Sequence, residues 1–307
     1  MRRQFSGATA ALLLLFFGDV AHAKELTPQV RAMIFAAPSS VSLRSRAVTI
    51  PLEGTDYHGA NKCPYMKVYI NGRGPFTFLY DSGSSYSMIS KRVMEAAHPE
   101  IVFDRAGARD VVRLKDVRIG GLMVHDLWTI HDDSFDVDGV FGFQAFSDLK
   151  LLFKLKDRKL VVSALPIALP NSFTMPYVLS HNIPTVALDV GNTTVRTLID
   201  TGDDAYAFEA RAEDLPGAKF AKPPVSAGNV KNGTNLQATS IATLADTVRL
   251  GPLAIANAEI GINDDLPISD IGYDLLTQFN FEFDPSNKEV MFQPLLPDAG
   301  IAIRAPH

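Results

Sequence analysis

The same series of short motifs occurs twice along this chain, in the same order. An apolar run ends in Asp-Ser-Gly at residues 81–83, and a second apolar run ends in Asp-Thr-Gly at residues 200–202, 119 positions later. Residues 117–122, Val-Arg-Ile-Gly-Gly-Leu, return as Val-Arg-Leu-Gly-Pro-Leu at residues 248–253, identical at four of six positions. Conserved order over this distance indicates an internal duplication.

A third pair of motifs fixes the spacing of the repeat. Val-Phe-Gly at residues 140–142 corresponds to Asp-Ile-Gly at residues 270–272, an offset of 130 against 131 for the Val-Arg motifs. In a chain of 307 residues this repeat indicates two units of similar fold. The second unit carries about twelve extra residues after its Asp motif, where a surface loop can lengthen at little free-energy cost.

Short strands dominate the predicted secondary structure. Runs rich in β-branched and aromatic residues, separated by Gly, Asn and Pro turns, predict strands at residues 66–70, 76–80, 117–119, 151–155, 279–283 and 289–292. Helices are few: Ser90 can cap a helix over residues 91–97, and single turns are expected around residues 144–148 and 274–278. The fold class is therefore predicted to be all-β with few short helices.

An Asp followed by a hydroxyl residue and Gly can be a simple turn or a catalytic loop. Alone, the motif ends a strand, and its carboxylate accepts backbone N–H groups. Two copies at equivalent places of a duplicated unit are more specific. Two carboxylates held about 3 Å apart in a partly desolvated site share one proton, so one can accept a proton from water while the other donates a hydrogen bond. Such a pair hydrolyses a substrate with no covalent intermediate, metal or cofactor.

The motifs resemble the active-site loops of the retropepsin and pepsin group of aspartic peptidases. Residues 78–85 and 197–202 are similar to those loops, and residues 140–142 and 271–272 are similar to the apolar-apolar-Gly segment that packs beneath each loop. The resemblance covers roughly residues 48 to 292. It implies a two-lobed acid-protease fold, with two closed-barrel-like retropepsin halves related by a pseudo-twofold axis at which the Asp loops meet.

Five parts of the chain follow from the resemblance and the composition. They are a signal peptide at residues 1–23, an N-terminal arm at 24–47, a first retropepsin-like lobe at 48–165, a linker at 166–176 and a second lobe at 177–307. Retropepsins need two chains because each supplies one Asp loop. This chain contains both loops, so we expect a monomer.

The resemblance also implies the roles of the motif residues. Asp81 and Asp200 are the expected catalytic pair of an aspartic endopeptidase acting on peptide or protein substrates. Ser82 and Thr201 are expected to hydrogen-bond to each other across the axis. The residues expected to support the two active-site loops are Ser82, Gly83, Ser84, Thr201, Gly202 and Asp203.

The second unit departs from the family pattern at three acidic residues. Asp203 and Asp204 stand where the first unit begins with Ser84, whose hydroxyl is expected to bond the neighbouring carboxylate, and Asp270 replaces an apolar residue. A carboxylate beside Asp200 is expected to raise the pKa of the catalytic pair. These departures leave open a proteolytically inactive protein that binds peptides or a partner through the same fold. A β-rich envelope protein whose Asp motifs are only turns is a third alternative.

Two hairpin tips lie where this family closes flaps over its substrate. Ala-Gly-Ala-Arg at residues 106–109 has this place in the first unit, and Asn232-Gly233 is a two-residue turn in the second. Neither tip carries the Tyr of the pepsin-like flap. An ordinary surface hairpin explains each segment equally well.

Composition and net charge limit the classes of partner and ligand that we expect for this chain. The net charge of -5 and the lack of a basic run argue against a nucleic-acid partner. Cys63 is the only cysteine, so no internal disulfide can form, and because its immediate neighbours in the sequence are Lys and Pro rather than His, we interpret it as a packing residue. The acidic segment at residues 131–138 lacks the spacing of a calcium-binding EF-hand and is expected to be a solvated loop.

The first residues have the pattern of a secretory signal. A short positive segment at residues 1–3 precedes an apolar run at residues 8–17 and Ala-His-Ala at residues 21–23. The apolar run falls well short of the roughly 20 residues that span a bilayer. We therefore expect an exported protein, periplasmic or secreted, with no stable membrane anchor.

We predict that the exported protein is cleaved after Ala23. Mass spectrometry of the exported fraction is expected to find Lys24 as the first residue, since small residues at positions 21 and 23 fit the cleavage site. An Ala23→Phe variant should accumulate uncut, whereas Ala36→Phe should be cut normally. Mature protein that retains Met1 would contradict the assignment.

Overall fold

The computed structural model describes residues 39–53, 63–103, 110–146, 149–232, 235–296 and 300–304, together with residues 32 and 34. The predicted signal peptide and the predicted flap tip at residues 106–109 lie outside these residues. Below, the first half is the described chain before the predicted linker, and the second half is the described chain after it.

β-Strands make up most of the described chain, and the prediction of a mainly β fold with few short helices is confirmed. The strands of the first half are β1 (Ser40–Leu43), β2 (Ala47–Pro51), β3 (Tyr65–Ile70), β4 (Arg73–Asp81), β5 (Met88–Ile89), β6 (Glu100–Phe103), β7 (Val111–Ile119), β8 (Leu122–His131), β9 (Gly139–Gly142), β10 (Lys150–Lys154) and β11 (Lys159–Ser163). The remaining strands are β12 (Phe173–Pro176), β13 (Val178–Ser180), β14 (Ile183–Val190), β15 (Thr193–Ile199), β16 (Phe208–Ala210), β17 (Phe220–Asn232), β18 (Asn235–Leu244), β19 (Val248–Leu250), β20 (Leu253–Ile255), β21 (Glu259–Ile262), β22 (Ser269–Ile271), β23 (Phe279–Asp284) and β24 (Glu289–Pro294). The helical segments are α2 (Lys91–Ala97), which begins after Ser90 as predicted, and the single turns η1 (Phe143–Phe146), η2 (Ala212–Asp214) and α3 (Tyr273–Leu276).

Six strands of the first half close into a barrel. The pairing runs β8-β5-β9-β4-β3-β7, and β7 pairs back with β8. Most pairs are antiparallel, but β4 lies parallel to β9 and β5 lies parallel to β8. Closure removes the exposed backbone edges that an open sheet would leave, and it fixes where β4 ends.

The second half repeats this order of pairings. β14 pairs with β15, β15 lies parallel to β22, β22 pairs with β16, and β16 lies parallel to β21. In the first half, β8 and β7 connect the sheet back to β3. In the second half, separate strands make the corresponding pairings: β18 pairs with β21, whereas β19 pairs with β14 and β20. The repeat seen in the sequence is therefore accompanied by a repeat in strand pairing.

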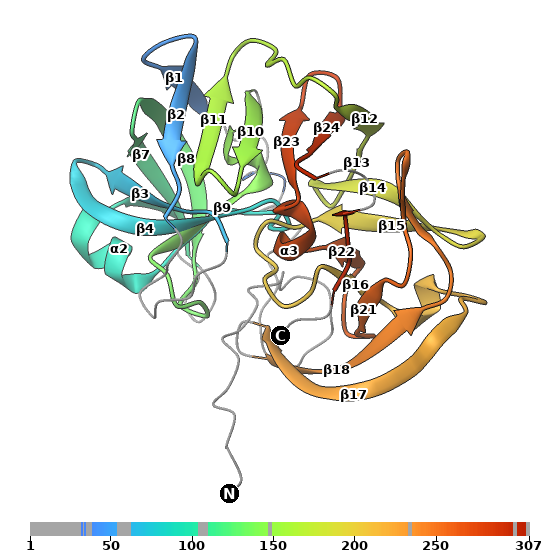
Figure 1. The fold of residues 1–307 in the computed structure, drawn as a ribbon. Helices are drawn as coiled ribbons and strands as arrows, with labels where there is room; N and C mark the ends of the chain where they lie inside the picture. Colours follow the sequence, from blue (N-terminus) through green and yellow to red (C-terminus); the bar gives the residue numbers. More distant parts are fainter. Residues whose placement is uncertain are drawn as a thin grey trace, which may run out of the picture.

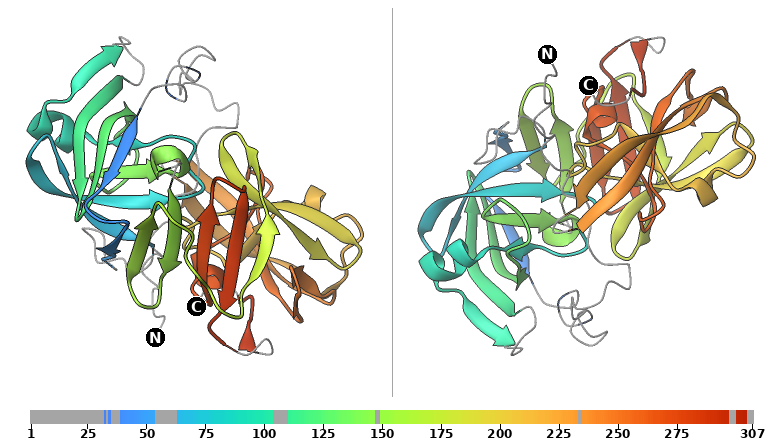
Figure 2. Two further views of the ribbon diagram at one scale, coloured as in Figure 1. Left: turned by 90° about the horizontal axis from the view of Figure 1, so that it is seen from above. Right: turned by 90° about the horizontal axis from the view of Figure 1, so that it is seen from below.

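A six-stranded sheet is shared by the two halves. Its order is β12-β24-β23-β10-β11-β2, so that β10 from the first half pairs with β23 from the second. In Figure 1 this sheet lies between the blue-to-green strands of the first half and the yellow-to-red strands of the second. Figure 2 shows the same arrangement from above and below.

Aromatic side chains hold the shared sheet to both halves. Phe153 of β10 stacks on Phe281 of β23 at 4.9 Å between ring centroids, and Phe143 meets Phe283 edge-on at 5.1 Å. All four side chains are buried. Aromatic pairs at these separations stabilise a fold by about 0.5–1.5 kcal/mol each beyond the area they bury.

Three segments differ from the prediction. No strand was predicted within the N-terminal arm, yet β1 pairs with β8, because its Val and Leu alternate with Ser and pack on the core. The end of the predicted linker forms β12, which pairs with β24. The acidic segment is not fully solvated: Asp138 is buried, accepts the N–H of Thr77 at 2.7 Å and pairs with Arg92 at 2.6 Å.

No helix among the described residues is long and apolar enough to cross a membrane.

Glu282 in the shared sheet gives a testable pH dependence. Its side chain is fully buried on β23 between Leu152 and Met291, and burial raises its pKa to about 7 although Lys150 opposes the shift. In the unfolded chain Glu ionises near pH ~4.3, so folding binds a proton between these values. The stability that this group contributes is present below pH ~4.3 and is lost as the pH rises towards about 7.

We predict that Glu282→Gln removes this loss. The difference in free energy of unfolding between the variant and the wild type should shift in favour of the variant by on the order of 3 kcal/mol as the pH rises from ~4 to ~8, as measured by urea unfolding. Glu95→Gln, at an exposed position on α2, should follow the wild type at every pH. Parallel curves for Glu282→Gln and wild type would show that folding does not raise the pKa of Glu282.

Candidate active site

The two Asp motifs lie at equivalent ends of equivalent strands. Asp81 is the last residue of β4, and Asp200 directly follows β15. The parallel partner strands have the same register, with Tyr80 opposite Phe141 and Ile199 opposite Ile271. The apolar-apolar-Gly segments therefore lie beside the strands that carry the Asp residues.

Crossed hydrogen bonds join the two Asp loops. The N–H of Ser82 donates to Thr201 Oγ1 at 3.0 Å, and the N–H of Thr201 donates to Ser82 Oγ at 3.0 Å. Each hydroxyl then donates to a carbonyl of the opposite strand, Ser82 to Ile199 at 2.6 Å and Thr201 to Tyr80 at 2.8 Å. The predicted contact between Ser82 and Thr201 is confirmed, and all of it is buried.

Each loop glycine lies against the carboxyl group of the opposite loop. A Cβ atom at Gly202 would come within 2.6 Å of Asp81 Cγ, and one at Gly83 would overlap the carboxyl group of Asp200. Any side chain at either position would therefore displace a carboxyl group. Glycine is required here by close approach.

The two carboxyl groups are oriented by matching backbone donors. The N–H of Gly83 donates to Asp81 Oδ1 at 2.8 Å, and the N–H of Gly202 donates to Asp200 Oδ1 at 2.7 Å. The N–H of Asp203 adds a second donor to Asp200 Oδ1 at 3.2 Å. Within the described chain no donor reaches Asp200 Oδ2.

Burial and mutual contact set the charge of the pair. Asp81 is 2% exposed and Asp200 is 0% exposed, and the two carboxyl groups lie within hydrogen-bond distance of each other. Burial raises the pKa of Asp81, and burial followed by the charge of Asp81 raises the pKa of Asp200. Two carboxylates in contact cannot both ionise near neutrality, so they share a proton. One member can then accept a proton while the other donates one.

The two expected supporting residues Ser84 and Asp203 have different outcomes: the hydroxyl of Ser84 does not make the predicted bond, whereas the charge of Asp203 adds to burial in raising the pKa of Asp81, as predicted. Ser84 was expected to bond the neighbouring carboxylate, but its hydroxyl donates to the carbonyl of Tyr86 at 2.8 Å. Asp203 is fully buried, and its Oδ1 accepts the N–H of Ala205 at 2.8 Å. Burial, and next the charge of Asp200, raises the pKa of Asp203.

Two further residues belong to the surroundings of the site. Cys63 is buried, as a packing residue should be, and its thiol lies 3.4 Å from the carbonyl oxygen of Gly202. Burial raises the pKa of this thiol, which disfavours a nucleophilic role. Glu209 is buried near Asp203 and has no sequence motif. The sequence shows only a Glu inside an apolar run. The pairing register of the strands is what places this Glu near the site.

Comparison with models of protein families matches no family, and comparison with curated proteins finds no relative. The assignment of function therefore rests on the geometry of this site.

The crossed hydrogen bonds make a direct prediction about stability. Thr201→Val keeps the shape of the side chain but leaves the N–H of Ser82 without this acceptor and the carbonyl of Tyr80 without this donor. We expect urea unfolding to show a loss of about 2–4 kcal/mol, since each buried group left unpaired costs about 1–3 kcal/mol.

Thr201→Ser is the matched control. It keeps the hydroxyl, and the first half has Ser82 at the equivalent place, so its stability should stay within about 1 kcal/mol of the wild type. Equal losses in the Val and Ser variants would show that packing of the methyl group, rather than the hydroxyl, holds the loops together.

Proposed function

We propose that this chain is an aspartic endopeptidase in which a water molecule held by Asp81 and Asp200 attacks a peptide bond. The observation that carries the proposal is the near-symmetric pair of buried carboxyl groups in contact, each oriented by the glycine N–H of its own loop. A turn that only ends a strand needs a single Asp. Such turns do not explain why two Asp carboxyl groups are buried against each other. The proposal includes export of the protein and function as a monomer.

The mechanism follows from the shared proton. The ionised carboxyl group accepts a proton from water as the water oxygen bonds to the carbonyl carbon of the substrate. The protonated carboxyl group donates a hydrogen bond to the carbonyl oxygen as negative charge develops there. The carboxyl group that accepted the proton from water then gives a proton to the amide nitrogen, the C–N bond breaks, and the amine and the carboxylic acid leave as products. Backbone donors occupy the Oδ1 atoms of both residues, and Oδ2 of Asp200 receives none from the described chain. In the proposed mechanism this oxygen binds the water once the groups that cover it are displaced. Because the environments of the two carboxyls are nearly symmetric, the roles of acid and base belong to the pair.

The fold supports a two-lobed acid-protease architecture. The closed barrel of the first half, the repeated pairings in the second, and the sheet shared between them match two lobes whose Asp loops meet where the lobes join. The crossed hydrogen bonds relate the loops by an approximate twofold axis. Both loops come from one chain, so the pair forms without a second copy.

The hairpin of β17 and β18 is the proposed flap of the second half. The strands pair as far as Asn232 opposite Asn235, and the hairpin curves along the lower edge of the second half in Figure 1. Val225 and Leu236 on this hairpin are 63% and 69% exposed. Exposed apolar side chains and strand edges suit contacts with an extended peptide. Peptides and proteins are therefore the proposed substrates.

Two observations favour the alternative of an inactive peptide-binding protein. Asp81 and Asp200 are almost completely buried, so that substrate must displace covering groups before it reaches them. The buried acid Asp203 also replaces the neutral Ser84 of the first half. A protein with these features could bind peptides through the same surfaces without cleaving them.

We predict that Asp81→Asn and Asp200→Asn each abolish cleavage. Incubation of the purified chain with a peptide library from acid to neutral pH, followed by sequencing of the products, measures the activity. Each variant should lose at least ~1000-fold in kcat/KM, and the double variant should be no worse, because residues that act as one unit are not additive. Asp136→Asn, at an exposed position, should keep full activity.

Either single variant with near-normal turnover would contradict the mechanism. A wild-type chain that binds library peptides but cleaves none at any pH would instead establish the binding protein.

A further inference from the structure

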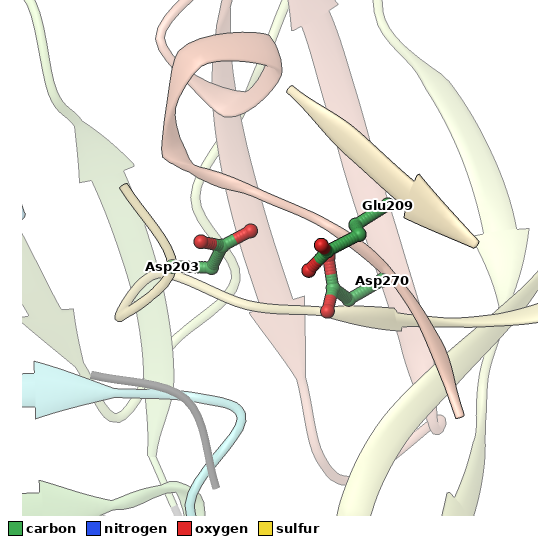
Figure 3. A group of neighbouring side chains, drawn as sticks. All are labelled: Asp203, Glu209 and Asp270. Carbon is green, nitrogen blue, oxygen red and sulfur yellow. The ribbon is translucent and has the colours of Figure 1, made fainter. Parts of the chain in front are cut away.

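Three buried carboxyl groups gather beside the loop of Asp200. Asp203 lies in that loop, Glu209 is in β16 and Asp270 is in β22, and one carboxyl oxygen from each lies within 4.8 Å of the others. Their exposed fractions are 0%, 2% and 0%. Figure 3 shows the three carboxyl groups turned toward one another from these separate elements. We call this group the acidic triad.

Four of the six carboxyl oxygens of the triad lack hydrogen-bond donors in the described part of the chain. Neither carboxyl oxygen of Asp270 accepts a hydrogen bond from a donor in the described part of the chain, and the same holds for Asp203 Oδ2 and Glu209 Oε1. The hydrogen-bond neighbour of Asp270 is the carboxyl group of Asp203, another acid. A buried carboxylate without a donor or a cation is strongly unfavourable.

The first half shows that the fold does not require acids at these positions. Glu209 lies opposite Asp270 in the pairing of β16 with β22, and Met88 lies opposite Val140 in the equivalent pairing of β5 with β9. Ser84 is the counterpart of Asp203, because each lies three residues after the Asp of its motif. All three counterparts, Ser84, Met88 and Val140, are therefore uncharged, whereas the second half has an acid at each position.

We propose that Asp203, Glu209 and Asp270 form a binding site for a hard divalent cation, with Ca²⁺ as the best fit. A cation offers the positive charge that no described donor supplies to these oxygens. This proposal does not depend on peptidase activity, because it rests on the triad alone.

The ligand set and its burial select the ion. All three ligands are carboxylates, which favour Ca²⁺, Mg²⁺ or Mn²⁺ over ions that prefer imidazole or thiolate. Mg²⁺ usually keeps several water molecules and binds only one or two carboxylates, whereas Ca²⁺ accepts about six to eight oxygen ligands in a flexible geometry. A site of three buried carboxyl groups that lie within 4.8 Å of one another therefore suits Ca²⁺ better.

A bound ion would brace the active-site loop of the second half. It would join β16 and β22 to the loop of Asp203, whose N–H donates to Asp200 Oδ1 at 3.2 Å. The first half achieves its own loop geometry with the hydrogen bond from Ser84 to the carbonyl of Tyr86. The proposed ion is thus a structural support for one loop, separate from the catalytic pair.

The test is calcium binding by the purified full chain at pH ~7 after removal of metals with EDTA. Isothermal titration with Ca²⁺ should show one site, with weaker binding of Mg²⁺. Ca²⁺ at 100 times its Kd should raise Tm by about 5 °C or more.

Variants that copy the first half locate the site. The double variant Glu209→Met with Asp270→Val should fold, because its counterparts Met88 and Val140 occupy these positions in the first half. It should bind no Ca²⁺, and its Tm should be the same in EDTA and in Ca²⁺. Asp136→Asn, an exposed acid, should keep both the binding and the shift.

Two outcomes would overturn the proposal. One is a wild-type chain that binds no Ca²⁺, has the same Tm in EDTA and in Ca²⁺, and gains stability only on acidification, which would make protons the occupants. The other is a calcium response that persists in the double variant, which would place the ion elsewhere.

Discussion

The crossed hydrogen bonds between Ser82 and Thr201 are the contact on which the candidate site depends. They tie the end of β4 to the end of β15, and so they set the separation of Asp81 and Asp200 as well as the joining of the two halves. All the groups involved are buried, so an unmade bond would leave a polar group without water. The same two hydroxyl groups therefore contribute to the stability of the fold and to the geometry of the candidate site.

A second constraint is the free energy of burying acids. The pair of Asp81 and Asp200 lowers it by sharing a proton and by accepting N–H groups from Gly83 and Gly202. In the acidic triad, neither carboxyl oxygen of Asp270 accepts a hydrogen bond from a donor in the described chain, and the equivalent positions in the other half are neutral. The two halves thus have a common strand pattern but different electrostatics, and this asymmetry is the main way in which the second half departs from a copy of the first.

Strand positions and the repeat could be predicted because they depend on local pattern. Alternation in residues 279–283 indicates a half-buried strand, and β23 has these residues. The pairing of Ser82 with Thr201 was also predictable, but only through the resemblance of the two motifs to a known kind of loop. Strand β1 was missed because four residues of Ser alternating with Val and Leu are too short a signal without the β8 edge that they join.

By itself, the sequence determined the β-rich class, the duplication and the two Asp residues, because each is written in contiguous residues or in a repeated spacing. The tertiary structure alone decided which side chains meet. Glu209 and Asp270 are 61 positions apart, and only the antiparallel register of β16 and β22 makes them neighbours. It also decided that Asp203 turns inward to them rather than toward water. Contacts between distant strands depend on register and closure of the barrel, and a linear pattern carries no direct record of either.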